Sequence, residues 1–292
     1  MSGNFHPPFQ RFNLVLPVLC ASLLFIDGMT AWAAPVISGV VIQPHRAIYT
    51  IKMVSSRAGS PLLGIDGKMM YSLEKSCDGW ISNHSFDLSY TYSENSPLKI
   101  WTKFTSFESL DGHNMQFSSE RYSNGELEQS LRGSAHSGQT EAANSAVYTS
   151  PEGLVYPLTV GTLFPVEHSR KLIAAAEAGQ KIFNAQVFDG SDDKGVAELN
   201  AIIGKRFDPV KDDVLGAHVD KSLMIQPSWH VELASFRDDP ETNAAEYELQ
   251  MTLLRNGIVK DMRVNYHDFS IEQNLVALED IKQEECGVST NE

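Results

Sequence analysis

An acidic loop at residues 189–195, Asp-Gly-Ser-Asp-Asp-Lys-Gly, is the first candidate for chemistry in this sequence. It places side-chain oxygens at positions one, three and five, as a calcium-binding EF-hand loop does. Such a loop also needs glycine at position six and a bidentate glutamate at position twelve, where Lys194 and Asn200 stand. We therefore interpret residues 189–195 as a structural turn, and we expect no metal and no other cofactor.

The nine histidines are dispersed, and no HExxH or HxH pairing would hold zinc. His168 stands beside Glu167, and adjacent helical residues point in different directions, so we interpret it as a lone surface histidine. No GxSxG, SxxK, Walker or GxGxxG motif occurs. We expect no catalytic residues and a protein that is not an enzyme. The alternative is a hydrolase whose triad is assembled from distant residues.

The first of the three cysteines, Cys20, lies in a leader-like segment. Arg11 precedes an apolar run at residues 14–26, and Ala31-Trp32-Ala33 follows with small residues at alternate positions, an order typical of a secretory signal peptide. The run is too short to span a bilayer as a helix. We predict cleavage after Ala33, a periplasmic location and no transmembrane anchor in the mature chain. An uncleaved anchor and a lipoprotein modified at Cys20 are the alternatives.

Removal of this leader leaves only Cys77 and Cys286. In an oxidising compartment these two cysteines predict one intramolecular disulfide, with two free thiols or an intermolecular bridge as alternatives. The bridge would close a loop of about 210 residues, which chain-entropy arithmetic makes worth roughly 5 kcal/mol. The C-terminal tail would thereby be tied to an early part of the fold.

Aromatic and methionine side chains occur in several strand-like segments and could line an apolar groove inside a curved sheet. The candidate groove-lining residues are Tyr49, Met53, Tyr71, Trp80, Trp101, Phe104 and Trp229. Such a groove would take an acyl chain or a peptide. The alternative is that these residues form the core, because aromatic side chains dominate core burial in β proteins.

The formal net charge of −14 argues against nucleic acid or anionic lipid as the main partner. Residues 34–292 are long enough for one large domain or two smaller ones. A disulfide between its early and late parts, and the lack of a convincing linker, favour a single domain. The oligomeric state stays open.

Period-two alternation of β-branched and aromatic residues predicts a mainly β fold. Strands are expected at residues 47–53, 68–73, 85–92, 100–107 and 115–122, with a spacing that suits a meander. Asn124-Gly125 and Asn256-Gly257 each stand between alternating runs and predict type I′ hairpins. Asp66-Gly67, Asp111-Gly112 and Asp189-Gly190 indicate further turns or surface loops.

One segment, residues 163–178, has helical spacing and an alanine run. Thr162 is the expected N-cap, Pro165 suits the first turn, and Gly179 is placed as the C′ residue. We predict one main helix that covers an open edge or mouth of the sheet.

Five short motifs, in this order, resemble the envelope integrity protein B (EipB) family of alphaproteobacteria. They are His45-Arg46-Ala47-Ile48-Tyr49, Gly67-Lys68-Met69-Met70-Tyr71 leading into Cys77-Asp78-Gly79-Trp80, Gly161-Thr162-Leu163-Phe164-Pro165, Val187-Phe188-Asp189-Gly190 and Glu285-Cys286-Gly287. The resemblance covers nearly all of the mature chain.

The resemblance implies a β-spiral, a curved antiparallel sheet coiling into an open barrel-like shape, with a role in cell-envelope integrity and no known reaction. It also implies a Cys77–Cys286 disulfide. The implied fold is similar to that of periplasmic lipoprotein carriers, an analogy of architecture alone. We expect a non-catalytic protein whose partner is a lipid, a lipoprotein or another envelope protein, with a structural scaffold as the alternative.

Overall fold

The computed structural model describes residues 39–94, 96–140, 143–209, 216–237, 244–283 and 286. The predicted leader and its cleavage site after Ala33 therefore lie outside the described residues. The chain from Ile37 to Glu292 forms one compact unit. Its described part is mainly β, with one large sheet and two helices, which confirms the predicted fold class.

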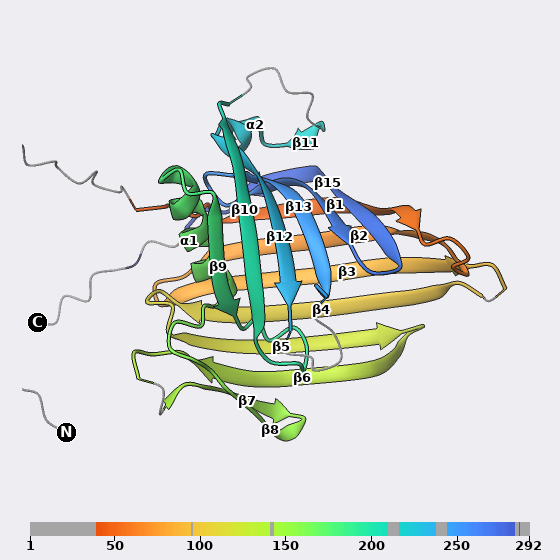
Figure 1. Cartoon of the computed structure of the whole chain (residues 1–292), viewed down its shortest axis with the longest axis horizontal. Helices are drawn as coiled ribbons and strands as arrows, with labels where there is room; N and C mark the ends of the chain where they lie inside the picture. The colour runs from red at the N-terminus through yellow and green to blue at the C-terminus, as the bar shows by residue number, and fades with distance from the viewer. Residues whose placement is uncertain are drawn as a thin grey trace, which may run out of the picture. The chain divides into compact units, whose positions relative to one another are not determined.

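The first half of the unit is an antiparallel meander of eight strands in chain order (Figure 1). Its strands are β1 His45–Ser56, β2 Leu62–Lys75, β3 Gly79–Tyr92, β4 Leu98–Ser109, β5 Asn114–Ser123, β6 Glu126–His136, β7 Ser145–Ser150 and β8 Glu152–Pro157. Each of the five strands expected from the sequence is present and longer than its alternating run, because pairing extends into the flanking residues.

The second half contains the helices and the remaining strands. They are α1 Pro165–Glu177, β9 Ile182–Val187, β10 Ala197–Phe207, β11 His218–Val219, α2 Lys221–Met224, β12 Ser228–Phe236, β13 Tyr247–Leu254, β14 Val259–Asn265 and β15 Phe269–Asp280. The sheet runs in the order β8-β7-β6-β5-β4-β3-β2-β1-β15-β14-β13-β12-β10-β9, with β11 alongside β15. Since β8 and β9 do not pair, the sheet stays open.

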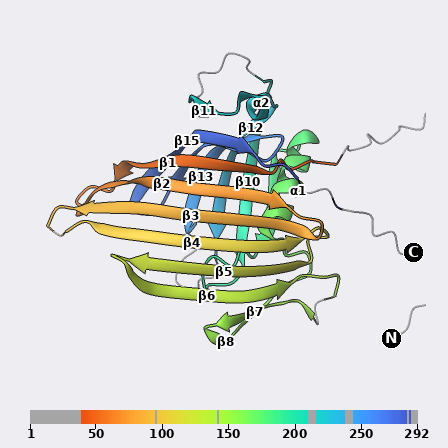
Figure 2. The ribbon, with the colours of Figure 1, turned by 180° about the vertical axis from the view of Figure 1, so that it is seen from behind.

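The first and last strands, β1 and β15, pair in the middle of this sheet with two register shifts. Such shifts bend a strand and increase its twist. The sheet curls so that β9, β10, β12 and β13 cross over β1–β6, as the views from the two sides agree (Figures 1 and 2). We call the side of each strand that points between these two layers the inner face.

The buried side chains of the core form four clusters. The first joins α1 to both layers and contains Val40, Ile42, Leu73, Val166, Leu172, Ile173, Ala175, Ala176, Ala201, Ile203, Trp229, Val231, Met251 and Leu253. The second, over β4–β8, contains Phe104, Met115, Phe117, Leu131, Ala135, Ala146, Tyr148, Leu158, Phe164 and Phe188. The third contains Ala47, Tyr49, Val219, Leu223, Leu254, Ile258 and Leu278, and the fourth contains Ile51, Leu62, Ile65, Val264 and Ile271.

Helix α1 covers one end of the two layers, as expected of the main helix. Its C-terminus ends at Gly179, which has φ +75°, with hydrogen bonds from Gly179 N–H to Ala176 and from Gln180 N–H to Ala175. This is the predicted glycine stop, in the form of a Schellman motif. The predicted N-cap is wrong: Phe164 occupies that position without a side-chain cap, and Thr162 is buried.

Two of the predicted turns differ in the structure. The hairpin at Asn256-Gly257 exists, but Gly257 alone has positive φ, and its N–H donates to Leu254 C=O. Asn256 therefore precedes a glycine bulge, whereas Asn124 and Gly125 both have the positive φ expected of a type I′ turn. Asp66-Gly67 is not a turn, because Gly67 lies inside β2 between Ile51 and Leu88.

Within the described part of the chain, no helix is long and apolar enough to cross a membrane.

Candidate binding cleft

The seven residues expected to line a groove lie in different places and do not line one groove. Tyr49, Phe104 and Trp229 belong to three separate core clusters, and Trp229 is only 2% exposed. The others pack around these clusters or lie outside them. Tyr71 and Trp80 pack against the first cluster and Met53 against the fourth, whereas Trp101 points to the outer face beside Tyr122. The described inner face is thus occupied largely by its own side chains.

A buried aromatic stack crosses the inner faces of β1, β2, β3 and β4. The Tyr71 ring lies 5.2 Å from His45 and 4.8 Å from His84, and His84 lies 5.7 Å from Phe104. Burial lowers the pKa of His84 to about 4 and also lowers that of His45, so both rings are neutral at pH 7. These histidines pack as core groups.

A buried carboxylate, Glu108, occupies the N-terminus of α1 where Thr162 was expected to act. Its two oxygens accept the Val166 N–H at 3.0 and 3.1 Å. Burial raises the pKa of Glu108 to about 7, although the hydrogen bonds from the helix act in the opposite direction. Sequence alone gave no signal for this contact, because Glu108 is 58 residues from Val166.

His168 is buried, so its interpretation as a surface histidine is wrong. It lies on the α1 face that packs against the core, with its ring 5.6 Å from Phe183 and its Nε2 without a hydrogen-bond partner. Burial lowers the pKa of His168 to about 4. The neutral ring therefore contributes packing and no charge.

A hydrolytic triad needs a histidine that reaches a serine hydroxyl. Among the described residues, no histidine ring nitrogen is hydrogen-bonded to a serine hydroxyl. The rings of His45 and His113 bond backbone carbonyls, and that of His136 bonds the Asn114 amide oxygen.

Oxygen atoms of the loop at residues 189–195 accept hydrogen bonds from other groups of the protein. Asp189 accepts hydrogen bonds from the N–H and hydroxyl of Ser191 at 2.9 Å each. Arg237 donates to the Asp192 carboxylate at 2.9 Å and to the Gly195 carbonyl at 2.6 Å. No three His, Cys, Asp or Glu residues gather as a metal site in the described ranges.

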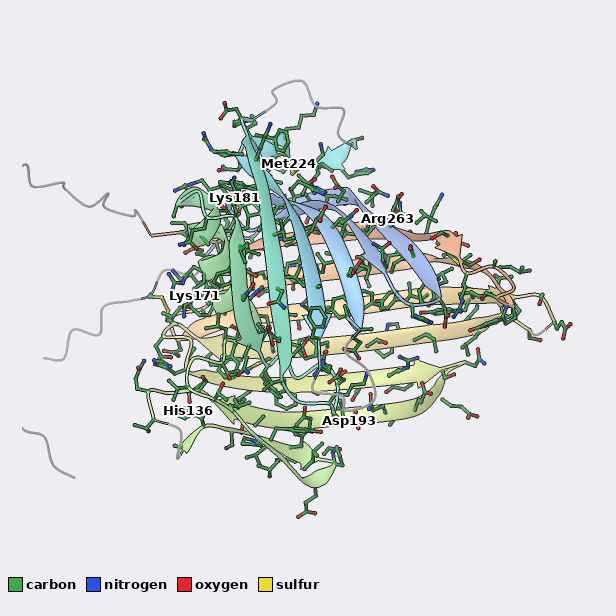
Figure 3. All side chains as sticks on the ribbon, viewed as in Figure 1. His136, Lys171, Lys181, Asp193, Met224 and Arg263 are labelled. Carbon is green, nitrogen blue, oxygen red and sulfur yellow. A yellow bond between two sulfur atoms is a disulfide. The ribbon has the colours of Figure 1, made fainter. Side chains whose placement is uncertain are left out.

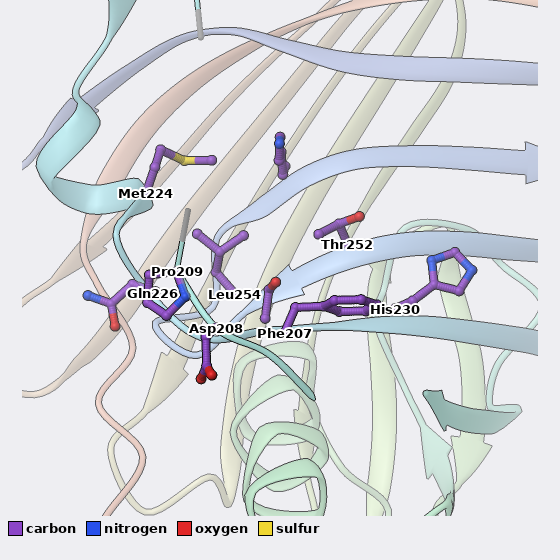
Figure 4. Close-up of a pocket in the computed structure, with 10 residues that line it drawn as sticks. Phe207, Asp208, Pro209, Met224, Gln226, His230, Thr252 and Leu254 are labelled. Atoms are coloured by element: carbon purple, nitrogen blue, oxygen red, sulfur yellow. The ribbon is translucent and has the colours of Figure 1, made fainter. Parts of the chain in front are cut away.

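The strongest candidate for ligand binding is a cleft of about 370 Å³ beside α2, on the outer face of β10, β12 and β13 (Figure 4). It lies at the opposite end of β10 from the 189–195 loop, as the labels of Met224 and Asp193 show in Figure 3. Its lining residues are Phe207, Asp208, Pro209, Met224, Gln226, Ser228, His230, Thr252, Leu254 and Lys260.

Local hydrogen bonds hold the wall that α2 provides. Asp220 caps α2 by accepting from the N–H of Ser222 at 2.9 Å. The Asn256 side-chain amide donates to the Leu223 carbonyl at 2.9 Å, which fastens α2 to the β13–β14 hairpin. The chain positions this wall independently of any ligand.

The lining of the cleft contains both apolar and polar side chains. Phe207, Met224 and Leu254 supply apolar surface, while His230 and Lys260 supply polar groups. Pockets of this composition bind amphipathic molecules, since the apolar part gives affinity and a few polar groups fix orientation. These residues were not predicted from the sequence. Two signals were available: Asp220-Lys221-Ser222, which is typical of a helix start, and Phe207, an aromatic residue at the end of a strand.

The Cys77–Cys286 disulfide is present, with 5.5 Å between the Cα atoms. It joins the β2–β3 turn to the chain after β15. Cys286 is therefore held beside β2 and β3.

The fold defines a β-barrel-like protein whose curved sheet remains open and has a cleft on its outer face. A crystal structure of the same class, that of the beta-barrel-like protein of domain of unknown function DUF1849 from Brucella abortus, has a TM-score of 0.75 and 30% sequence identity to this chain. The match covers 84% of this chain and all of that one.

A second relative is the cell envelope integrity protein EipB of Brucella abortus (strain 2308), which is 31% identical over 277 residues. The alignment covers 92% of this chain and 95% of the relative. The EipB-like family model matches residues 37–282, and the chain belongs to that family. The resemblance seen in the sequence motifs is confirmed.

Proposed function

We propose that this protein supports the integrity of the cell envelope by binding an amphipathic partner, without catalysis, in the cleft beside α2. The Brucella relative carries the name of a cell envelope integrity protein, which supports the envelope role. The predicted signal peptide supports action in the periplasm. The observation that carries the binding proposal is the mixed lining of the cleft.

The partner suited to this lining has an apolar segment next to a polar or anionic group. Phe207 and Met224 would contact the apolar segment, with Leu254 as a buried floor. His230 and Lys260 would contact the polar group. An acyl chain on a lipid or a lipoprotein has this chemistry.

The cleft lies beside the sheet, whereas the groove expected from the sequence lay inside it. Tyr49, Phe104 and Trp229 pack into the core clusters, which supports a binding site on the outer face of the sheet. The cleft also needs no opening of the sheet before a partner binds.

Site-specific photo-crosslinking in cells tests this proposal, with a photoreactive residue at position 207 and a matched one at position 202. Phe207 and Ile202 are 55% and 59% exposed on the outer face of β10, but only Phe207 lines the cleft. We expect a lipid or lipoprotein adduct at 207 and none at 202. Phe207→Ser should also weaken envelope resistance to detergent, whereas Ile202→Ser should not.

A structural scaffold is the second candidate function, favoured by an exposed apolar pair. Ile182 and Ile202 face each other directly on β9 and β10, and both are largely exposed. A defined protein adduct at 202, without one at 207, would favour the scaffold and overturn the cleft proposal.

A further inference from the structure

A row of small polar side chains crosses the outer face of the meander, on the face that Figure 2 turns toward the viewer. Ser72, Asn83, Thr105 and Ser118 occupy matched positions on β2, β3, β4 and β5. Asn83 donates to the Ser72 hydroxyl at 3.2 Å, and Thr105 donates to the Asn83 amide oxygen at 2.9 Å. The row is an ordered strip of hydroxyl and amide groups with no charge of its own.

Two hollows adjoin this row from opposite sides. One, of about 590 Å³, includes Thr105 and Ser118 together with apolar Ile81 and Phe107. The other, of about 400 Å³, includes Ser72 and Asn83. Asn83 and Thr105 are neighbours in the row but belong to different hollows, so the two hollows lie side by side. We call the row and these two hollows together the outer trough.

An aromatic pair borders the trough on the side of the second hollow. Trp101 lines this hollow, is 38% exposed and has its ring 5.1 Å from that of Tyr122 on the next strand. Met70, also in the lining, is half exposed. An exposed aromatic face beside a polar strip suits a ligand with both apolar C–H faces and polar edges.

Cations stand at both ends of the row and beside it. Arg46 pairs with Ser72 in register, Arg132 pairs with Ser118, and Lys103 lines the second hollow. Among the described residues, no carboxylate lies within ion-pair distance of Lys103 or Arg132. These charges therefore remain available on a protein whose net charge is −14.

Carboxylates on the same face lie beside the row: Glu120 is opposite Lys103 in register, and Glu74 follows Ser72 by two residues on β2. Glu120 accepts from the Tyr122 hydroxyl at 3.3 Å, and Glu279 lies 4.0 Å from Arg46. Asp87 pairs with Trp101 in register, one strand away. The row itself is thus uncharged, and both cations and carboxylates border it.

We propose that the outer trough binds a glycan strand that carries carboxylate groups. Sugar hydroxyl and acetamido groups can exchange hydrogen bonds with the serine, threonine and asparagine row, while a sugar ring stacks on Trp101. Arginine and lysine bind the carboxylates. The row from β1 to β6 spans five strand spacings, about 24 Å, so the ligand is an oligomer.

A glycan fits this surface better than a peptide. Peptides that add to sheets bind at an edge, where backbone groups are unpaired. The trough lies on the faces of β2–β5, whose backbone groups are used in the strand ladders on both sides. The proposal concerns the meander layer, so it does not depend on the cleft beside α2.

Titration calorimetry of the mature chain with a hyaluronan hexasaccharide, which alternates glucuronate and N-acetylglucosamine, tests the proposal. Neutral chitohexaose and hexaglutamate serve as comparison ligands. Lys103→Gln should weaken hexasaccharide binding about tenfold, since a charge-assisted hydrogen bond is lost. Lys99→Gln is the matched control, because Lys99 is exposed on the same face of β4 and lies outside the trough.

Trp101→Ala should weaken binding about fivefold or more through loss of stacking. Circular dichroism should show that this surface variant folds normally. Binding of the hexasaccharide that exceeds binding of both comparison ligands, and that is weakened by Lys103→Gln and Trp101→Ala only, supports the proposal. No hexasaccharide binding, equal binding of hexaglutamate or chitohexaose, or equal effects of Lys99→Gln and Lys103→Gln would overturn it.

Discussion

The Tyr148 hydroxyl donates a 2.6 Å hydrogen bond to the backbone carbonyl of Asp192. Tyr148 lies on β7, next to one terminal strand of the sheet, and Asp192 lies in the loop that follows the other terminal strand, β9. Tyr156 on β8 donates in the same way to the Asp193 carbonyl. The two ends of the open sheet are therefore joined through a loop and side chains instead of a strand ladder.

Tyr148→Phe should lower the free energy of unfolding by about 1 kcal/mol, because it removes this hydrogen bond and keeps the ring in place. Hydrogen exchange at residues 189–195 should also become faster. Tyr92→Phe is the control, since Tyr92 is partly buried and has no side-chain hydrogen bond among the described residues. Equal exchange rates in Tyr148→Phe and the wild type would contradict a fastening role.

Cys77→Ser should lower the melting temperature by roughly 10 °C under oxidising conditions, because the bridge closes a loop with a sequence separation of 209. Reduction should lower the melting temperature of the wild type to a similar value and leave the variant unchanged. Intact mass should show the oxidised wild type two hydrogens lighter than its reduced form. If Cys77→Ser had the same melting temperature as the oxidised wild type, the bridge would not be stabilising.

Gly67→Ala and Gly64→Ala form a matched pair within β2. A Cβ at Gly67 would lie 2.1 Å from the Asp87 carbonyl oxygen, whereas the nearest atom to a Cβ at Gly64 is 4.0 Å away. We expect Gly67→Ala to cost about 2 kcal/mol or more by forcing β2 and β3 apart, and Gly64→Ala to be nearly neutral. Urea unfolding of both variants measures the difference. Similar urea midpoints for the two variants would show that β2 and β3 can move apart at this contact at little cost in stability.

The buried His168 predicts a loss of stability on acidification. Its pKa is about 4 in the folded state and near 6.5 when unfolded, so between these values the unfolded chain binds a proton that the folded chain does not. This group alone reduces stability by up to about 3 kcal/mol as the pH falls from 6.5 to 4. His168→Leu should remove that part of the pH dependence. His267→Gln, at an exposed site, should leave it unchanged in urea titrations at pH 7 and 4.5.

The buried Glu108 has the opposite pH dependence. Its pKa is raised from 4.5 to about 7, so the folded state retains a proton that the unfolded state loses as the pH rises through this range. The contribution of Glu108 to the free energy of unfolding is present below pH 4.5 and is lost as the pH rises through 7. The free energy of unfolding of Glu108→Gln relative to the wild type should therefore increase between pH 5 and 8. A constant difference across that range would indicate an unshifted carboxyl.

The strand content and main helix could be predicted from the sequence because alternation and the Gly179 stop are local signals. The environment of His168 could not, since it depends on β9 packing against α1. Gly67 resembled a turn residue because Asp-Gly is common in turns, yet the close approach of β3 to β2 requires a glycine there.

The candidate sites depended even more on long-range geometry. Alternation indicates that Trp101 and Trp229 lie in strands, but which face of a strand meets the second layer depends on how the sheet curls. The cleft beside α2 needs β10, β12 and β13 side by side with a one-turn helix, an arrangement set by pairings across many residues. A single sequence contains no local signal for such pairings.

The central position of β1 and β15 has a consequence for the order of folding. Strands β1–β8 can pair as each follows the last during synthesis, but the second edge of β1 has no partner until the final strand, Phe269–Asp280, is made. An unpaired central edge is a template for pairing with another chain, and contacts so distant in sequence slow folding. Incomplete chains of this protein should therefore be prone to misassembly at β1, and completion of β15 is the event that removes this risk.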